Sequence, residues 1–363
     1  MQFFSRTARM FPPPQYLAMS GAGIDIGSHS VKSMVLAQQR AGCVLQSYRE
    51  TPLAEGVVVD GDIEQPDKMV ELLRSLRLRE RIRFAHASLS ERKAYLYQTW
   101  VPSSERNLRA AVEFSLESHV PIPPNDVVFD FEVVQRDGEG THVSVTAYAK
   151  RVIELYQQVF NDAGITLRSL EVESQALGRA VLSPEDKKHT TMVVDFGKKT
   201  TRIAIFEHGV VGFTVTVDVG GETLTTAVMK HFNVDADEAE KIKNTRGFLE
   251  GGENRELYET LMATISVFKD EVERHVTYWD SSYEKEFTSH PVESIILVGG
   301  NANLKGLPEY LSRSLNVPVR VGNVWTNAFS FDRYVPALPH TTSLEYAATV
   351  GLALRSCNNK NFL

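Results

Sequence analysis

Two short segments of the chain place an aspartate and a glycine at the end of an apolar run. Asp25-Ile-Gly27 is followed by Ser28, His29 and Ser30, and Asp195-Phe-Gly197 is followed by Lys198, Lys199 and Thr200. Successive backbone N–H groups in such a turn form a concavity that binds anions, and glycine lets the backbone approach a polyphosphate closely. The hydroxyls of Ser28, Ser30, Thr200 and Thr201 could donate to phosphate oxygens. These segments therefore predict two phosphate-binding loops.

A cation must lie between these two aspartates and a bound phosphate, because like charges repel. Mg²⁺ retains several waters and is often held by one or two carboxylates together with phosphates, so we expect Asp25 and Asp195 to hold Mg²⁺ through water. Lys32 and Lys198 or Lys199 are expected to neutralise the phosphates. A single Asp-x-Gly is ordinary turn chemistry, whereas two aligned copies favour a site.

A third segment, Gly299-Gly300-Asn301, follows the apolar run Ser294–Val298. Glycines also precede Asp25, but their spacing and their position before the strand do not fit a dinucleotide fingerprint. Neither a Walker A sequence nor a serine elbow occurs in the chain.

The elements around these segments form an internal repeat with an offset of 170 residues. In each copy an apolar strand leads to Asp-x-Gly, a second strand follows, and a third strand comes after a turn at Gly42 or Gly209. The repeat predicts two related α/β lobes, each opening with a hairpin. Apolar residues from Leu257 to Trp279 recur at helical spacing and predict one helix of nearly thirty residues that packs in the core rather than in a coiled coil.

We predict the following division of the chain: a loose tail at 1–20, a first lobe at 21–188, a second lobe at 189–339 and a C-terminal helix at 340–363 that returns to the first lobe. Within the first lobe, residues from about 84 to 150 read as strand, helix, strand, strand. The helix of this inserted α+β unit spans Ser104–Val120 and ends before Pro121, because proline cannot continue it.

Composition excludes several classes of protein. The formal net charge is −7, which disfavours a protein that coats nucleic acid. The two cysteines form no metal or disulfide framework. We find neither a signal peptide nor an apolar run long enough to span a membrane, and the polar end of the chain argues against an amphipathic anchor. These features predict a cytoplasmic protein without direct membrane insertion.

The order of the motifs resembles the superfamily of actin, heat-shock chaperones and sugar kinases, and the resemblance extends from residue 23 to residue 353. It implies two ribonuclease H-like lobes that bind ATP and Mg²⁺ between them. Asp25–Lys32 and Asp195–Thr201 match its phosphate motifs, and Gly299, Gly300 and Asn301 match its adenosine motif. Glu240 and Lys243 match the pair that flanks the ribose and adenine, and Glu173 matches the residue that positions the attacking water. An exposed carboxylate at a helix end explains Glu173 equally well.

Within that superfamily the chain is similar to the PilM family of type IV pilus assembly, with an inserted unit like that of FtsA. Stretches that carry this similarity include Val112–Pro123, Val127–Val133, Val219–Leu224 and Gly299–Pro308. The family implies an ATP-binding scaffold beneath the inner membrane that holds the N-terminal cytoplasmic tail of a PilN-type membrane protein, supports twitching, and assembles into a homo-oligomeric ring. The alternatives are an FtsA-like filament protein, a type II secretion module, or an ATP-hydrolysing enzyme of the same superfamily. The sequence favours nucleotide binding over turnover, with at most weak ATPase activity.

Overall fold

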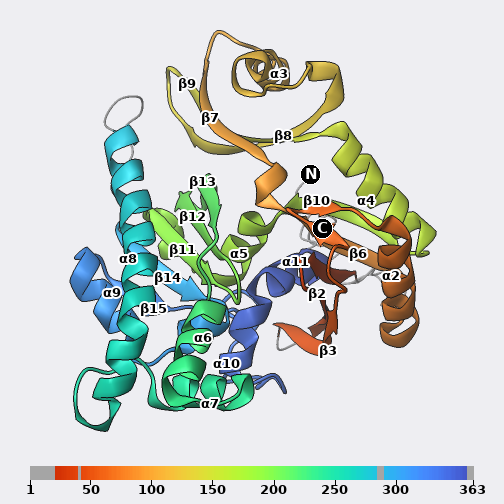
Figure 1. Ribbon diagram of the computed structural model, residues 1–363. Coiled ribbons are helices and arrows are strands. Elements are labelled where there is room, and N and C mark those ends of the chain that lie inside the picture. Colours follow the sequence, from red (N-terminus) through yellow and green to blue (C-terminus); the bar gives the residue numbers. More distant parts are fainter. Residues whose placement is uncertain (1–20, 40–41, 284–289, 358–363) are drawn as a thin grey trace.

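The computed structural model describes residues 21–39, 42–283 and 290–357, and its architecture rests on two five-stranded sheets (Figure 1). The predicted tail at 1–20 and the last six residues, 358–363, lie outside the described residues. The first sheet has the strand order β10-β6-β1-β2-β3. Its strands are β1 (Ala22–Ile26), β2 (Ser30–Gln39), β3 (Gly42–Pro52), β6 (Phe84–Leu89) and β10 (Thr166–Val172).

The second sheet repeats the first, with the order β13-β12-β11-β14-β15. In both sheets a three-stranded antiparallel meander continues into two parallel strands, so that β1 corresponds to β11 and β6 to β14. Asp25 pairs with Lys32 in the first hairpin, and Asp195 pairs with Arg202 in the second. The strands are β11 (Thr191–Phe196), β12 (Thr201–Glu207), β13 (Val210–Val217), β14 (Ser294–Val298) and β15 (Val319–Val321). The repeat seen in the sequence is thus a repeat of topology.

A separate three-stranded sheet, with the order β7-β9-β8, carries α3 on one face and lies at the top of the molecule in Figure 1. It consists of β7 (Tyr95–Pro102), α3 (Leu108–His119), β8 (Val127–Arg136) and β9 (Gly140–Ala149). We expected this inserted unit to begin at about residue 84. Instead β6 pairs with β1 and β10 in the first sheet, because its small side chains Ala85 and Ala87 are buried in that core.

Helices flank and connect the sheets. In Figure 1, α2 and α4 lie beside the first sheet and α8 runs along the far side of the second, while α5 and α11 lie between them. The helices are α2 (Pro66–Glu80), α4 (Lys150–Asp162), α5 (Glu173–Val181), α6 (Gly221–Phe232), α7 (Ala236–Arg246), α8 (Arg255–Tyr283), α9 (Leu307–Leu315), α10 (His340–Ser343) and α11 (Ala347–Cys357). Short elements complete the fold: β4 (Val58–Val59), β5 (Asp62–Ile63), η2 (Glu91–Lys93), η3 (Pro124–Asp126), η4 (Asp186–Lys188), η5 (Gly252–Asn254), η6 (Gly300–Asn303) and η7 (Leu344–Tyr346).

The prediction for α8 is confirmed. The helix has 29 residues, and its apolar stripe from Leu257 to Val272 is fully buried in the larger core cluster. A coiled-coil seam would leave that stripe exposed in a single chain, so its burial against the second sheet identifies it as core packing. Among the described residues no helix combines the length and apolar character needed to cross a bilayer.

The two central helices, α5 and α11, cross at very short range. Alanine at Gly351 of α11 would place its Cβ 1.8 Å from the carbonyl oxygen of Ala176 in α5. Arg179 of α5 donates to the Gly351 carbonyl at 3.0 Å and pairs with the buried Glu171 at the end of β10. This crossing joins the two halves of the molecule, because α11 also packs on β1 and β2.

The stability of the first lobe should depend on pH through His86. Its Nδ1 lies 2.8 Å from the Ser169 hydroxyl, and burial, aided by the charge of Arg355, lowers the pKa of His86 from 6.5 to about 4. The unfolded chain therefore takes up a proton at a higher pH than the folded protein, and stability falls as the pH drops from about 6.5 to 4. We expect His86→Gln to remove roughly 2 kcal/mol of this pH-dependent loss, measured by urea unfolding across that range. His340→Gln, at an exposed position of α10, is the control; an unchanged pH profile in His86→Gln would contradict the assignment.

Candidate functional site

The two Asp-x-Gly segments form equivalent hairpin loops. Gly27 N–H donates to the Ser30 carbonyl at 3.0 Å, and Gly197 N–H donates to the Thr200 carbonyl at 3.1 Å. The pattern of buried, half-buried and exposed residues is the same, position by position, in 21–30 and 191–200. Ser28, Lys198 and Lys199 are exposed at the tips, while both aspartates are half-buried at the strand ends. The same local sequence pattern has thus produced the same local environment twice.

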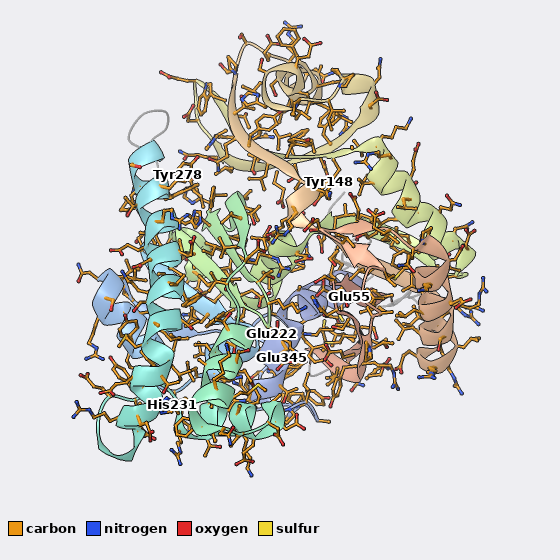
Figure 2. All side chains as sticks on the ribbon, viewed as in Figure 1. Glu55, Tyr148, Glu222, His231, Tyr278 and Glu345 are labelled. Carbon is orange, nitrogen blue, oxygen red and sulfur yellow. The ribbon has the colours of Figure 1, made fainter. Side chains whose placement is uncertain are left out.

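Charges of the second loop act on a side chain of the first loop. Burial lowers the pKa of His29 in the first loop, and Lys199 and Lys198 of the second loop lower it further. Glu222 and Glu55 act in the opposite direction on the same ring. Figure 2 places the labelled Glu55, Glu222 and Glu345 toward the centre of the molecule, between the two sheets in that view. The first and second loops therefore border one common region.

The two aspartates have different partners. Asp25 Oδ1 accepts a hydrogen bond from the Ser88 hydroxyl at 2.7 Å, and Asp195 Oδ2 accepts one from Arg202 Nη1 at 2.7 Å. Burial raises the pKa of Asp195 to about 7, Lys32 opposes this shift, and the charge of Asp25 adds to it. A carboxylate that titrates near neutrality under the influence of a second carboxylate is a common feature of functional sites.

This donor set fits a nucleotide-borne Mg²⁺ better than a resident metal. Within the described part of the chain, no group of three or more His, Cys, Asp or Glu side chains could hold an ion by itself. Mg²⁺ that arrives with phosphates requires only one or two carboxylates and retains waters. Asp25 and Asp195, with an excess of negative charge around them from Glu91 and Glu345, meet that requirement.

The predicted phosphate-binding hydroxyls separate into two groups. Ser28 lies exposed beside His29, Ser30 donates to Glu50 Oε1 at 2.6 Å, and Thr200 is half-buried at its loop. Thr201 differs from these three, because it is fully buried and its hydroxyl donates to the Val219 carbonyl at 2.6 Å. Its side chain thus ties β12 to the segment before α6 and does not point toward the loops. Thr201 holds the second loop in place.

Replacing Thr201 with valine should therefore affect stability and leave nucleotide binding alone. We expect a loss of about 1 kcal/mol, because the Val219 carbonyl loses its partner while the shape of the side chain is kept. Thr200→Val, one position away on the other side of the backbone, should leave stability unchanged and weaken ATP binding. Chemical unfolding and calorimetric titration of both variants would check this. A Thr201→Val protein of normal stability that no longer binds ATP would contradict it.

Lys32 reaches across to the C-terminal segment. Its Nζ donates to the Glu345 carbonyl at 2.9 Å and lies 5.4 Å from the centre of the Tyr346 ring. Its charge acts on Asp195, so the first hairpin contributes a cation to the region shared by both loops.

The pair Glu240 and Lys243 joins Asn301 of the adenosine motif in one hydrogen-bonded corner. Lys243 is buried and donates to Glu240 Oε2 at 2.7 Å and to Asn301 Oδ1 at 2.9 Å. Asn301 in turn donates to the carbonyls of Phe196 and Gly197 at 3.2 and 2.8 Å. Burial lowers the pKa of Lys243, whereas the hydrogen bonds from Lys243 and Thr225 to Glu240 outweigh burial and lower the pKa of that carboxylate. Asn301 thereby locks this corner to the second loop.

The glycines of the motif are required by close approach. Gly299 has φ +86°, and a Cβ there would lie 2.5 Å from Asp195 Oδ1. At Gly300 a Cβ would lie 2.9 Å from Glu345 Oε1. Both positions therefore keep the strand end of β14 directly against the acidic side chains of the site.

Glu173 lies in the interior of the site, together with two residues that sequence reasoning did not assign. It begins α5, is 4% exposed, and forms an ion pair with Arg202. Glu91 of η2 lies 3.5 Å from Arg202 and accepts the Ser174 N–H at 2.8 Å. The available signal for Arg202 was its position in the repeat, equivalent to Lys32. Nothing in the sequence around Glu91 indicated a role in the site, because η2 lies beside Arg202 only in the folded structure.

Two cavities lie beside this region. One, of about 780 Å³, opens where the inserted sheet meets the first lobe, between η2, the beginning of β7, η3 and the beginning of α4. The other, of about 740 Å³, lies between the segment before α8 and α9 and is lined by Phe248, Tyr258 and Tyr310 among others. Neither of the two is lined by Asp25 or Asp195.

Comparison with known proteins bears on both the fold and the family. Cell division protein FtsA of Neisseria meningitidis serogroup B is 25% identical over 201 residues, which cover 50% of this chain and 48% of FtsA. The chain thus spans about half the length of the FtsA proteins that it matches.

Solved structures with the same architecture include the PilM–PilN type IV pilus biogenesis complex, with a TM-score of 0.74, 22% identity, and coverage of 93% of this chain and 99% of the other. MreB5 of Spiroplasma citri bound to ADP gives a TM-score of 0.51 at 12% identity, with coverage of 91% and 95%. These likenesses confirm the predicted actin-like α/β fold. The family described as type IV pilus assembly protein PilM matches residues 23–357. This chain, with its duplicated hairpin loops and inserted sheet, therefore belongs to the PilM family of type IV pilus assembly proteins.

Proposed function

We propose that this protein is an ATP-binding scaffold of type IV pilus assembly that works at the cytoplasmic face of the inner membrane. The observation that carries the proposal is the pair of equivalent loops around Asp25 and Asp195, which border one region together with the corner formed by Lys243 and Asn301. ATP with Mg²⁺ would place its phosphates between the loops and its adenosine beside Glu240 and Lys243. Bound Mg²⁺ would supply positive charge to the phosphates.

Nucleotide turnover is proposed to be slow. The carboxylate of Glu173, which the superfamily would use to position water, is paired with Arg202 and buried. A carboxylate held by a guanidinium is a weak proton acceptor and is not free to orient a water molecule. This favours a role in which ATP binding joins the lobes and organises the inserted sheet.

The inserted sheet is proposed to hold the N-terminal tail of a PilN-type membrane protein. Its outer strands, β7 and β8, each have one edge without a strand partner in that sheet, and extended peptides bind at such edges. The 780 Å³ cavity at its base combines apolar Tyr95, Ile122 and Val152 with basic residues of η2 and α4. Tyr148, labelled in Figure 2, anchors this end of β9 by donating to the Ser90 carbonyl at 3.2 Å. A cavity that combines apolar and basic side chains suits a short peptide that offers both kinds of contact.

Calorimetric titration tests the proposal with two ligands, Mg·ATP and a synthetic PilN-type N-terminal peptide. We expect both to bind, and we expect Asp25→Ala and Asp195→Ala to weaken ATP by about 100-fold or more while the peptide still binds. Arg151→Glu in the cavity wall should weaken the peptide alone; Arg106→Glu, exposed elsewhere in the inserted unit, is the charge-matched control. Folded protein that binds neither ligand would overturn the scaffold function. Rapid phosphate release would instead favour an ATP-hydrolysing enzyme.

The homo-oligomeric ring remains part of this proposal and is open to a separate measurement. Light scattering or native mass spectrometry of the ATP-bound protein with the peptide is expected to show assemblies larger than the apo protein. A chain that stays monomeric with both ligands bound would contradict the ring.

A further inference from the structure

The end of α2 and the turn that follows it carry an arginine cluster, which consists of Arg74, Arg77, Arg79, Arg81 and Arg83. Among the described residues no member of the cluster lies within ion-pair distance of a carboxylate. Glu80, the one acidic residue between Arg74 and Arg83, is paired with Arg49 at 2.7 Å. A chain with a formal net charge of −7 therefore gathers uncompensated positive charge at one place.

Helix stability accounts for only part of this arrangement. Positive charge near the C-terminal end of a helix is favourable, because the last carbonyl groups have no partner within the helix. Arg77 and Arg79 lie in that last turn of α2. Arg81 and Arg83 lie beyond the helix, and Arg74 lies before its last turn. These three arginines are exposed, and the helix dipole does not explain them.

An exposed leucine lies in the middle of the arginine cluster. Leu78 is 66% exposed, whereas α2 buries Leu73 and Leu76 against the core of the first lobe. Residues three or four apart share one face of a helix, so Leu78 lies on the same face as Arg74 and Arg81. An apolar side chain surrounded by cations is typical of surfaces that bind at the boundary between water and lipid.

Helix α4 links the arginine cluster to the cavity at the base of the inserted sheet. Its first residues, 150–152, line that cavity. At its other end the Asp162 carbonyl accepts a hydrogen bond from Arg74 at 2.9 Å, and a Cβ at Gly164 would lie 3.3 Å from the Arg77 guanidinium. The helix has 13 residues. Cluster and cavity are therefore separated by about 20 Å, and α2 and α4 lie together on the side of the molecule away from the second sheet (Figure 1).

The chemistry of the arginine cluster favours a phospholipid surface over other polyanions. Guanidinium groups form strong, often bidentate hydrogen bonds with phosphate oxygens, and several cations together attract an anionic membrane. Neither of the two cavities described above lies at the cluster, so its members present themselves on an open surface. Single-stranded nucleic acid would require aromatic rings for stacking, and Phe84, next to Arg83, is half-buried beneath Arg168.

We propose that the arginine cluster, with Leu78 at its centre, is a contact surface for anionic phospholipids. The guanidinium groups lie on the lipid headgroups, and Leu78 enters the boundary between headgroups and acyl chains. This contact is peripheral and uses an end of a helix that is otherwise packed in the first lobe. The inference goes beyond the proposed scaffold function, because it requires neither ATP nor the peptide.

Sedimentation of the full chain with vesicles tests this surface in the absence of both ligands. Equimolar phosphatidylcholine and phosphatidylglycerol are compared with phosphatidylcholine alone. We expect the wild-type protein to partition at least about tenfold more strongly onto the anionic vesicles at low salt, and to lose this preference at about 1 M salt, where charges are screened within about 3 Å.

Variants assign the binding to the arginine cluster. The combination of Arg79→Gln, Arg81→Gln and Arg83→Gln should lower partitioning by about 100-fold, since each cation at an anionic surface contributes roughly fivefold. Leu78→Ser should lower it by about tenfold, because the apolar contact is lost. The charge-matched control combines Arg106→Gln, Arg255→Gln and Arg274→Gln at exposed positions outside the cluster, and it should bind like the wild type.

Several outcomes would overturn this inference and leave the scaffold function intact. Equal sedimentation of the wild type with both kinds of vesicle is one of them, and unchanged binding by the triple cluster variant is another. A control variant that loses as much binding as the cluster variant would show that only overall charge matters. Retention on single-stranded DNA without binding to vesicles would identify nucleic acid as the partner instead. Because the comparison of the two vesicles with wild-type protein is decisive on its own, a variant that folds poorly does not weaken the test.

Discussion

Replacing Gly351 with alanine is expected to destabilise the protein by about 3 kcal/mol, near the upper end of what added atoms cost in a packed core. The new Cβ would lie 1.8 Å from the carbonyl oxygen of Ala176 and 2.5 Å from its carbonyl carbon. Both are backbone atoms, so no side-chain rotation can relieve the contact. Either α5 or α11 must shift, and α11 is packed on β1 and β2.

Urea unfolding of Gly351→Ala measures this effect, with Gly138→Ala as the matched control. Gly138 lies in the turn before β9, where a Cβ would meet nothing within 4 Å. The same chemical change should therefore have almost no effect there. If the two variants unfold at the same urea concentration, the close crossing of α5 and α11 does not exist in solution.

Replacing Gly221 with alanine is expected to impair both stability and nucleotide binding. Its Cβ would lie 2.0 Å from Oδ1 and 2.1 Å from Nδ2 of Asn301. Asn301 cannot move aside without losing its hydrogen bonds to Lys243 and to the carbonyls of Phe196 and Gly197. We expect a loss of about 2 kcal/mol in unfolding free energy and about tenfold in ATP affinity, because the second loop loses its support.

A double-mutant cycle isolates the cause of that loss. In an Asn301→Ala background the clash is absent, so adding Gly221→Ala should cost little, and alanine even favours a helix over glycine. The predicted coupling between the two sites is about 2 kcal/mol, in the range seen for residues in contact. Strictly additive effects of the two substitutions would show that the Gly221–Asn301 contact does not govern the loop.

The duplicated part of the fold was predictable because its pattern is local. An apolar strand, Asp-x-Gly, polar loop residues and a second strand are all contained within about fifteen residues, and the second copy doubles the signal. The same holds for α7, where Asp235 is the N-cap and its side chain accepts the Glu238 N–H three residues later. Local hydrogen bonds and strand alternation determine such features, so they can be predicted directly from the sequence.

Features that depend on contacts between distant segments were not predictable in the same way. Arg202 is paired with Glu91 of η2 and Glu173 of α5, and no spacing rule links these segments to β12. Strand β6 was assigned to the inserted unit because a short apolar run does not reveal which sheet it will join. Thr201 was predicted to donate to phosphate, although its counterpart in the first repeat, the fully buried Val31, is an apolar residue and was a signal for burial that the prediction did not use.

The inserted sheet described above has a core cluster of its own. It consists of seven buried residues from β7, α3, the residue that ends α3, and β9: Val101, Val112, Leu116, Val120, Val143, Val145 and Ala147. The larger clusters, by contrast, lie in the two main sheets and their helices, and the cluster of the second sheet extends to Met34, Leu36 and Cys43 of the first. A unit with a small separate core can open while the rest stays folded, so its amide hydrogens should exchange with solvent faster than those of β1 and β11. A partner that binds there would slow this exchange. Hydrogen exchange in this unit would therefore report whether the partner is bound, without any rearrangement of the two nucleotide-binding lobes.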